Sequence, residues 1–238
     1  MPLSPLIRFG TSTWAYEGWQ GQIYQRQYAK TTFARECLGE YCQYLHNGEP
    51  LFRTVGNDST FYRPPTANQL RHYLNQIPED FEMCFKVWEE ITIPDFTSHV
   101  RYGSKAGQPN PRFLDAKLFN ELVLTPYREA RFEPHLGPFI FEFQRHGLTS
   151  QEFCARLDRF FSDIPQDLDS AVEIRNVELL GPEYPWSSPR LQPLVIHAAL
   201  GRPASTAARA LHRAFHRHSP AHAAQHELRN GKETGGAL

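Results

Sequence analysis

PFIFEFQ, at residues 138–144, alternates strictly between two kinds of side chain. One set of alternating positions carries Phe139, Phe141 and Phe143, and the other carries Ile140, Glu142 and Gln144. Successive side chains of a β-strand point to opposite faces, so this period of two predicts a strand with one purely aromatic face. The aromatic face is expected to pack on helices, which leaves the glutamate and the glutamine on the opposite face of the sheet.

Four further segments have the same strand character, and helical patterns separate them. The expected strands are Leu6–Thr11, Leu51–Val55, Glu82–Val87, Pro138–Phe143 and Ala171–Arg175. The expected helices are Thr31–Leu45, Thr66–Ile77, Asp115–Arg131 and Ser150–Ile164, with Thr66 and Ser150 as N-caps. Alternating strands and helices indicate parallel strands joined by crossover helices, and the length of 238 residues suits one α/β domain of the TIM-barrel type.

Bulk composition excludes several classes of protein. With 25 basic and 26 acidic residues the net charge is -1, so no general attraction to nucleic acid or to an anionic membrane is expected. A secretory signal and a bilayer-spanning apolar run are both missing from the sequence, which predicts a cytoplasmic protein. The four cysteines lack zinc-site spacing, and no dinucleotide or Walker-type phosphate motif is present. We therefore expect no metal and no organic cofactor, and the oligomeric state stays open.

The character of the chain changes after residue 181. Residues 182–238 contain 11 alanines, six of the 11 histidines, seven basic residues and only three acidic ones. This asymmetry predicts a barrel-like domain at 1–181 and a weakly ordered Ala/His/Arg/Pro-rich tail at 182–238. A complete barrel has eight strands. The tail offers one more strand, Leu194–His197, and one helix, Ala204–His216, so the barrel is expected to be incomplete, with five to six parallel strands.

Strand alternation also selects the candidate catalytic residues. It places Lys86, Glu142, Glu173 and Arg175 on the polar faces of three strands, near their C-terminal ends, where barrel enzymes carry their active sites. Neighbouring acids and bases shift one another's pKa values and can transfer protons. The alternative interpretation is a structural ion-pair network that only neutralises buried charges, and we weigh it about equally.

The loops that follow the first two strands supply candidate substrate-binding residues. Hydroxyl and aromatic side chains cluster there, and Arg63 is suited to hold an anion. The candidates are Thr11, Ser12, Trp14, Tyr16, Asp58, Ser59, Thr60, Tyr62 and Arg63. The alternatives are a packed aromatic lid in the first loop and an Asx-type turn in the second.

Several motifs occur in the order found in one known family. They are GTSTWAYEGWQGQIY at 10–24, STFYRPPT at 59–66, FKV at 85–87, LGPFIFEF at 136–143 and AVEIRN at 171–176. Together they resemble the YecE-like family (domain of unknown function 72) over roughly residues 7–181. The resemblance implies a TIM-barrel-like fold and no established substrate. The chain departs from the usual family pattern at Gly56, Asp58 and Glu142, and its tail does not resemble the family.

The resemblance also carries over residue by residue. The matching positions are Thr11, Ser12, Trp14, Tyr16, Trp19, Ser59, Thr60, Phe61, Tyr62, Lys86, Glu173 and Arg175.

Three hypotheses about function follow. The first is an enzyme that acts on a small polar or anionic substrate at the C-terminal mouth of the barrel. The second is a non-catalytic module that binds a phosphate-bearing ligand, or nucleic acid, although the near-neutral charge argues against nucleic acid. The third is an inactive remnant of a truncated or frameshifted gene.

Overall fold

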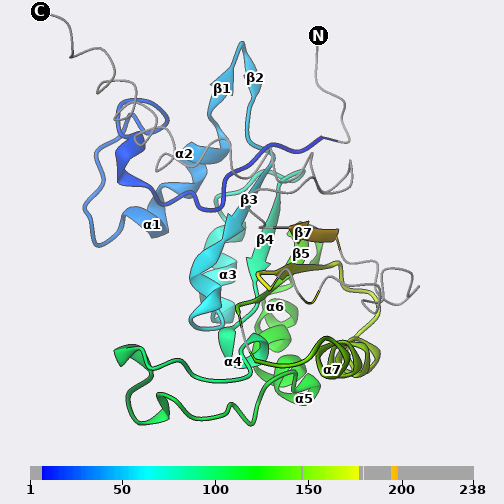
Figure 1. Cartoon of the computed structure of the whole chain (residues 1–238). Coiled ribbons are helices and arrows are strands. Elements are labelled where there is room, and N and C mark those ends of the chain that lie inside the picture. Colours follow the sequence, from blue (N-terminus) through cyan, green and yellow to red (C-terminus); the bar gives the residue numbers. More distant parts are fainter. Residues whose placement is uncertain (1–6, 146, 177–178, 180–193, 198–238) are drawn as a thin grey trace, which may run out of the picture.

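The computed structural model describes residues 7–145, 147–176, 179 and 194–197. Two sheets are formed by these residues, a short hairpin and a larger parallel sheet. The hairpin consists of β1 (Leu45–His46) and β2 (Glu49–Pro50), and it projects away from the parallel sheet (Figure 1). The strands of the parallel sheet are β3 (Thr54–Asn57), β4 (Glu82–Lys86), β5 (Leu136–Phe143), β6 (Ser170–Ile174) and β7 (Leu194–His197).

Strand order in the parallel sheet follows chain order, β3-β4-β5-β6-β7. Register places Asn57 beside Phe85, Lys86 beside Ile140, and Glu142 beside Glu173. The expected strand Leu194–His197 is confirmed residue by residue, because β7 pairs in parallel with β6. The fold is therefore a mixed α/β fold built on a parallel sheet. The expected helix Ala204–His216 lies outside the described residues.

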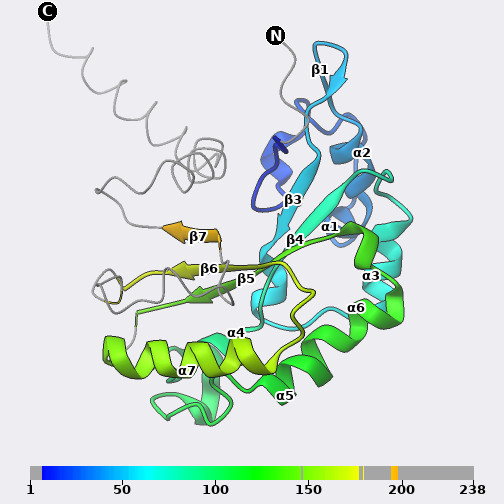
Figure 2. The ribbon, with the colours of Figure 1, turned by 90° about the vertical axis from the view of Figure 1, so that its right-hand side faces the viewer.

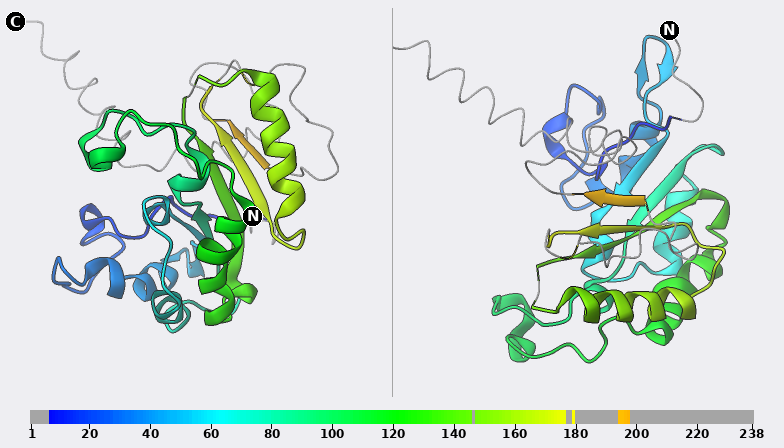
Figure 3. Two further views of the ribbon diagram at one scale, coloured as in Figure 1. Left: turned by 90° about the horizontal axis from the view of Figure 1, so that it is seen from below. Right: turned by 45° about the vertical axis from the view of Figure 1, so that its right-hand side comes forward.

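Helices and single helical turns connect the strands. They are η1 (Glu17–Trp19), α1 (Phe33–Glu36), α2 (Leu38–Cys42), η2 (Asp58–Phe61), α3 (Ala67–Leu74), α4 (Glu89–Thr92), η3 (Val100–Lys105), α5 (Ala116–Leu118), the π-helical η4 (Phe119–Leu124), α6 (Thr125–Ala130), η5 (Glu133–His135) and α7 (Ser150–Asp163). α3, α5, α6 and α7 cover one face of the sheet (Figures 2 and 3). None of the described helices is both long and apolar enough to cross a membrane.

The aromatic face of β5 forms the centre of the core, as its alternation predicts. Phe139, Phe141 and Phe143 are each at most 1% exposed. Phe119 of η4 lies 5.7 Å from Phe139 and 5.6 Å from Phe141 between ring centroids, and Phe153 of α7 lies 5.0 Å from Phe143. Offset and edge-to-face contacts of this kind are favourable for aromatic pairs. The aromatic face is thus occupied by the helix layer, and the polar face of the sheet is left for other contacts.

Four local expectations need correction. The expected strand Leu51–Val55 begins only at Thr54 and continues to Asn57. Residues 7–11 form no regular strand, although Phe9 and Thr11 still accept hydrogen bonds from the backbone of β3. The predicted helix Thr31–Leu45 is divided at Cys37 into α1 and α2. The N-cap of α7 is Thr149 rather than Ser150, because the Thr149 side chain forms a capping box with Glu152. The Thr66 cap of α3 is confirmed as a capping box with Gln69.

Close backbone contact explains the irregular first segment. A Cβ atom on Gly10 would lie 2.2 Å from the carbonyl oxygen of Thr54. Only glycine tolerates such an approach. Thr11 is then fixed by Tyr41, whose hydroxyl lies 3.1 Å from Thr11 N and 2.9 Å from Thr11 Oγ1. These contacts place residues 12–16 next to the C-terminal end of β3.

Candidate functional site

Five charged side chains meet at the C-terminal ends of four neighbouring strands. We call this set the charged cluster: Asp58, Lys86, Glu142, Glu173 and Arg175. Lys86 pairs with Ile140, and Glu142 pairs with Glu173, so the three charged side chains lie on one face of the sheet within two residues of the same level. The four predicted catalytic residues are all members, and Asp58 joins them from the predicted substrate-binding set.

Lys86 is at the centre of the charged cluster. Its Nζ lies 2.5 Å from Glu142 Oε2, 3.4 Å from Asp58 Oδ1 and 3.9 Å from Glu173 Oε2. Burial alone would lower the pKa of Lys86, but the three carboxylates outweigh burial and raise that pKa above its usual value. The ammonium group therefore stays charged at neutral pH.

Glu142 joins the two cations of the charged cluster. Its other oxygen, Oε1, lies 3.0 Å from Arg175 Nη2, so one carboxylate contacts both Lys86 and Arg175. Its side chain is 6% exposed, which makes it the most deeply buried charge in the cluster. Arg175 also reaches Glu173 Oε1 at 3.1 Å. Glu142 thus fixes the relative positions of the two cations.

Glu173 has the environment of a group that can exchange a proton. Burial raises its pKa, because removing the carboxylate from water disfavours the charged form. Lys86 and Arg175 act in the opposite direction, and Glu142 adds to the rise. A carboxyl group with a raised pKa holds its proton closer to neutral pH, where general acid–base catalysis requires it.

The pH dependence of stability is expected to report this raised pKa. Because the folded state binds the Glu173 proton more tightly than the unfolded chain, Glu173 adds stability below its unfolded pKa of about 4.3. That contribution is lost as the pH rises through the folded pKa. The free energy of unfolding of Glu173→Gln, measured relative to wild type in urea, should therefore increase from pH 4 to pH 7.

A carboxylate of the opposite kind serves as the control for this measurement. Hydrogen bonds from Thr149 lower the pKa of Glu152. Glu152→Gln should accordingly lose stability relative to wild type over the same pH interval. If the free energy of unfolding relative to wild type changed in the same direction with pH for both variants, the inference that the pKa of Glu173 is raised would be wrong.

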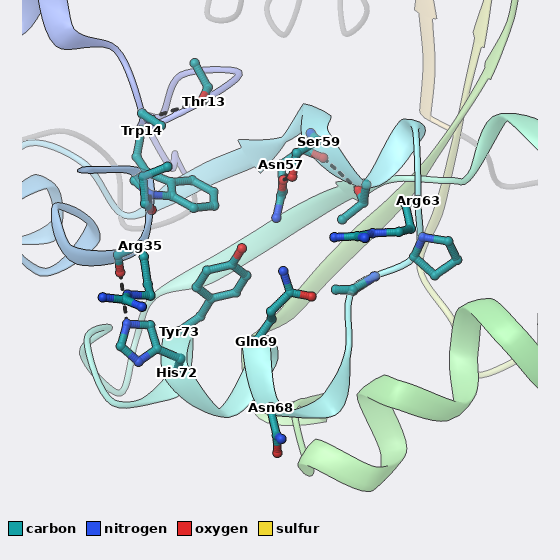
Figure 4. A pocket seen from close by; sticks show the side chains of 15 residues that line it. Thr13, Trp14, Arg35, Asn57, Ser59, Arg63, Asn68, Gln69, His72 and Tyr73 are labelled. Atoms are coloured by element: carbon teal, nitrogen blue, oxygen red, sulfur yellow. Dashed lines mark hydrogen bonds between the residues drawn. The ribbon is translucent and has the colours of Figure 1, made fainter. Parts of the chain in front are cut away.

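The remaining candidate residues divide into two groups. Trp14, Ser59, Thr60 and Arg63 line a cavity between residues 13–15 and α3. We call it the α3 cavity (Figure 4). Thr11, Ser12, Tyr16 and Tyr62 are not among its lining residues. Tyr62 is 60% exposed and lies under the guanidinium of Arg101, and Tyr16 is 42% exposed against Trp19.

One turn links the α3 cavity to the charged cluster. Asn57 and Asp58 are consecutive, but Asn57 lines the cavity while Asp58 contacts Lys86. The Thr60 hydroxyl lies 2.8 Å from the carbonyl oxygen of Asn57 and 2.7 Å from that of Lys86. The two candidate sites therefore lie on opposite sides of the end of β3.

Sequence reasoning missed several residues of the α3 cavity, among them Asn57, Gln69 and Tyr73. Asn57 could have been found from alternation, since it precedes Asp58 and must point to the other face. Gln69 and Tyr73 have the spacing of an ordinary helix face and gave no signal. Among the described residues, no group of three or more His, Cys, Asp or Glu side chains is arranged to hold a metal ion.

Comparison with solved structures finds DUF72 family proteins. A DUF72 family protein from Enterococcus faecalis is 20% identical with a TM-score of 0.49, and the match covers 74% of this chain and 54% of that chain. A second crystal structure of it gives 17% identity, a TM-score of 0.45, and coverage of 80% and 61%. A DUF72 family protein from Thermotoga maritima gives 20% identity, a TM-score of 0.44, and coverage of 71% and 56%.

This chain thus spans less than two thirds of the length of each of these solved chains. No curated protein matches it. The family model described as "Protein of unknown function DUF72" matches residues 8–187, which include both candidate sites. The chain therefore belongs to the DUF72 family.

Proposed function

We propose that this chain is an enzyme that acts on a small polar or anionic substrate at the charged cluster. The observation that carries the proposal is the position of Lys86, held by three carboxylates at the C-terminal ends of parallel strands. Ligands of open α/β sheets bind at that edge. We further infer that the sheet is an open part of a TIM-barrel-like fold, in which the same edge carries the active site.

Each member of the charged cluster has a distinct role in this proposal. Glu173 transfers the proton, because burial raises its pKa. Lys86 and Arg175 stabilise negative charge that develops on the substrate. Glu142 is a positioning residue, since it contacts both cations and is itself buried. Hydrolase, lyase and isomerase chemistry are all compatible with this set of groups.

The test is a search for turnover with the full chain. A panel of hydroxycarboxylic acids and sugar phosphates is incubated with the protein and followed by ¹H NMR, which detects both line broadening on binding and conversion. Turnover should fall at least about 100-fold in Glu173→Gln, the usual contribution of a general acid or base. It should persist in Glu133→Gln, which removes an exposed carboxylate of η5.

Two results would contradict the proposal. One is turnover that survives in Glu173→Gln at the wild-type rate. The other is a panel that shows neither binding nor conversion, which would favour the interpretation of the charged cluster as a structural ion-pair network.

A further inference from the structure

The α3 cavity has the size and the walls of a small-molecule site. Its volume is about 540 Å³, inside the range of about 300–1,000 Å³ found for ligand pockets. Trp14 and Pro65 are buried in its wall, and Pro64 and Tyr73 extend this apolar surface. Most of the lining is thus apolar, which suits the carbon skeleton of an organic ligand rather than a bare inorganic ion.

The side chains with a permanent charge that line the α3 cavity are two arginines, Arg35 and Arg63. No aspartate or glutamate lines it. Arg63 forms no ion pair and no hydrogen bond with any other residue in the described part of the chain, and Figure 4 shows its guanidinium extending toward the middle of the cavity. Gln69 uses its Oε1 to accept from Thr66 in the capping box, which leaves its Nε2 available. An uncompensated cation beside a free amide donor favours an anion.

Asn57 adds a buried amide donor that faces the Tyr73 hydroxyl. The residue is 3% exposed, and its Oδ1 accepts from Ser59 N at 3.1 Å and from Ser59 Oγ at 2.6 Å. Those two bonds fix the orientation of the amide, so Nδ2 points the other way, toward the Tyr73 hydroxyl (Figure 4). Nδ2 makes no hydrogen bond of ordinary geometry. A buried donor whose acceptor is poorly aligned is unfavourable, and a ligand oxygen at this end of the cavity would satisfy it.

We propose that the α3 cavity binds a small organic oxyanion, namely a phosphate or carboxylate group attached to a flat apolar ring. The oxyanion contacts Arg63 and Gln69, and the ring lies against Trp14 and the two prolines. The proposal goes beyond catalysis at the charged cluster and does not depend on it, because none of the five residues of that cluster lines the cavity.

Calorimetric titration of the full chain tests this proposal with four probes. Phenyl phosphate and benzoate carry both a ring and an anion, inorganic phosphate lacks the ring, and benzyl alcohol lacks the anion. At least one of the first two should bind more tightly than both of the others. Phenyl phosphate and benzoate also separate the two possible anions. Inorganic phosphate binding as tightly as phenyl phosphate would overturn the assignment of the ring.

Variants locate the binding site. Arg63→Gln should weaken binding of the best probe about tenfold or more, the size expected for loss of a charge-assisted hydrogen bond. Arg63 is exposed and unpaired among the described residues, so the variant should fold with an unchanged Tm. Arg128→Gln removes an exposed arginine of α6 that does not line the cavity, and it should bind like wild type.

Two further measurements distinguish binding in the α3 cavity from binding at the charged cluster. Arg175→Gln should leave binding of the best probe intact; loss of binding there would place the ligand at the charged cluster and overturn the assignment to the α3 cavity. In ¹H–¹⁵N spectra the probe should shift the side-chain amide signal of Asn57, identified by its disappearance in Asn57→Asp. Unchanged affinity in Arg63→Gln, or no binding of either ring-bearing anion at millimolar concentration, would also overturn the proposal.

Discussion

Replacing Lys86 with methionine is expected to lower the free energy of unfolding by about 3–5 kcal/mol at pH 7, the range for removal of one partner from a buried ion pair. Lys86 is the common partner of Asp58, Glu142 and Glu173. Without it, three neighbouring carboxylates share one arginine, and the buried Glu142 loses its shortest contact. Urea unfolding at equilibrium measures the change.

The pH dependence of the Lys86→Met variant identifies the cause of its instability. Loss of the ammonium group raises the pKa values of the carboxylates that faced it, so they take up protons as the pH falls. Because such groups add stability below their unfolded pKa and lose it as the pH rises, the deficit should shrink between pH 7 and pH 5. If the loss of unfolding free energy relative to wild type were the same at all pH values, it would instead indicate lost packing of the aliphatic part of the lysine side chain.

Lys117→Met is the matched control for this variant. Lys117 is 81% exposed and lies 3.8 Å from Glu121 on the helix surface. Exposed pairs of this kind contribute at most about 1 kcal/mol. If the two lysine variants were equally stable, the charged cluster would not act as a buried unit.

Replacing Phe141 with alanine is the second change with a large expected effect, a loss of about 3–5 kcal/mol. Its ring is fully buried and lies 5.6, 5.5 and 5.0 Å from the rings of Phe119, Phe160 and Phe161. Removing the ring leaves a cavity between β5 and two helical elements, which packed neighbours fill only in part. The midpoint of urea unfolding should fall while the slope stays that of wild type.

Val100→Ala provides the control for the core variant. Val100 is 86% exposed in η3, and its replacement should change stability by less than about 0.5 kcal/mol. A Phe141→Ala variant as stable as Val100→Ala would mean that the aromatic face of β5 is not the centre of the core.

Much of the sheet could be predicted because strand alternation depends on local sequence alone. The three phenylalanines of β5 and the short strand Leu194–His197 were assigned from the pattern of their own side chains. The first segment failed because its geometry depends on a distant contact, the approach of Gly10 to Thr54. Similarly, the division of the first helix at Cys37 interrupts a spacing of four that looks continuous in the sequence.

The two candidate sites differ in how far the sequence reveals them. The charged cluster follows from two rules, alternation within a strand and parallel pairing between strands, which together bring Lys86, Glu142 and Glu173 to one face of the sheet. The α3 cavity depends on how closely α3 approaches residues 13–15, and this distance has no local signature. Tyr73 therefore looked like any partly buried residue of an amphipathic helix.

Strand order that follows chain order also bears on how this molecule is made. Each strand from β4 to β7 pairs with the strand that leaves the ribosome just before it. The sheet can therefore grow by addition at one edge while synthesis continues, since domains generally fold from the N-terminal side during translation. Until the next strand arrives, the newest strand presents unpaired backbone groups, and such edges are sites of aggregation. Ribosome-bound intermediates in which the newest strand still awaits its neighbour are consequently the stages at which chaperone protection matters most.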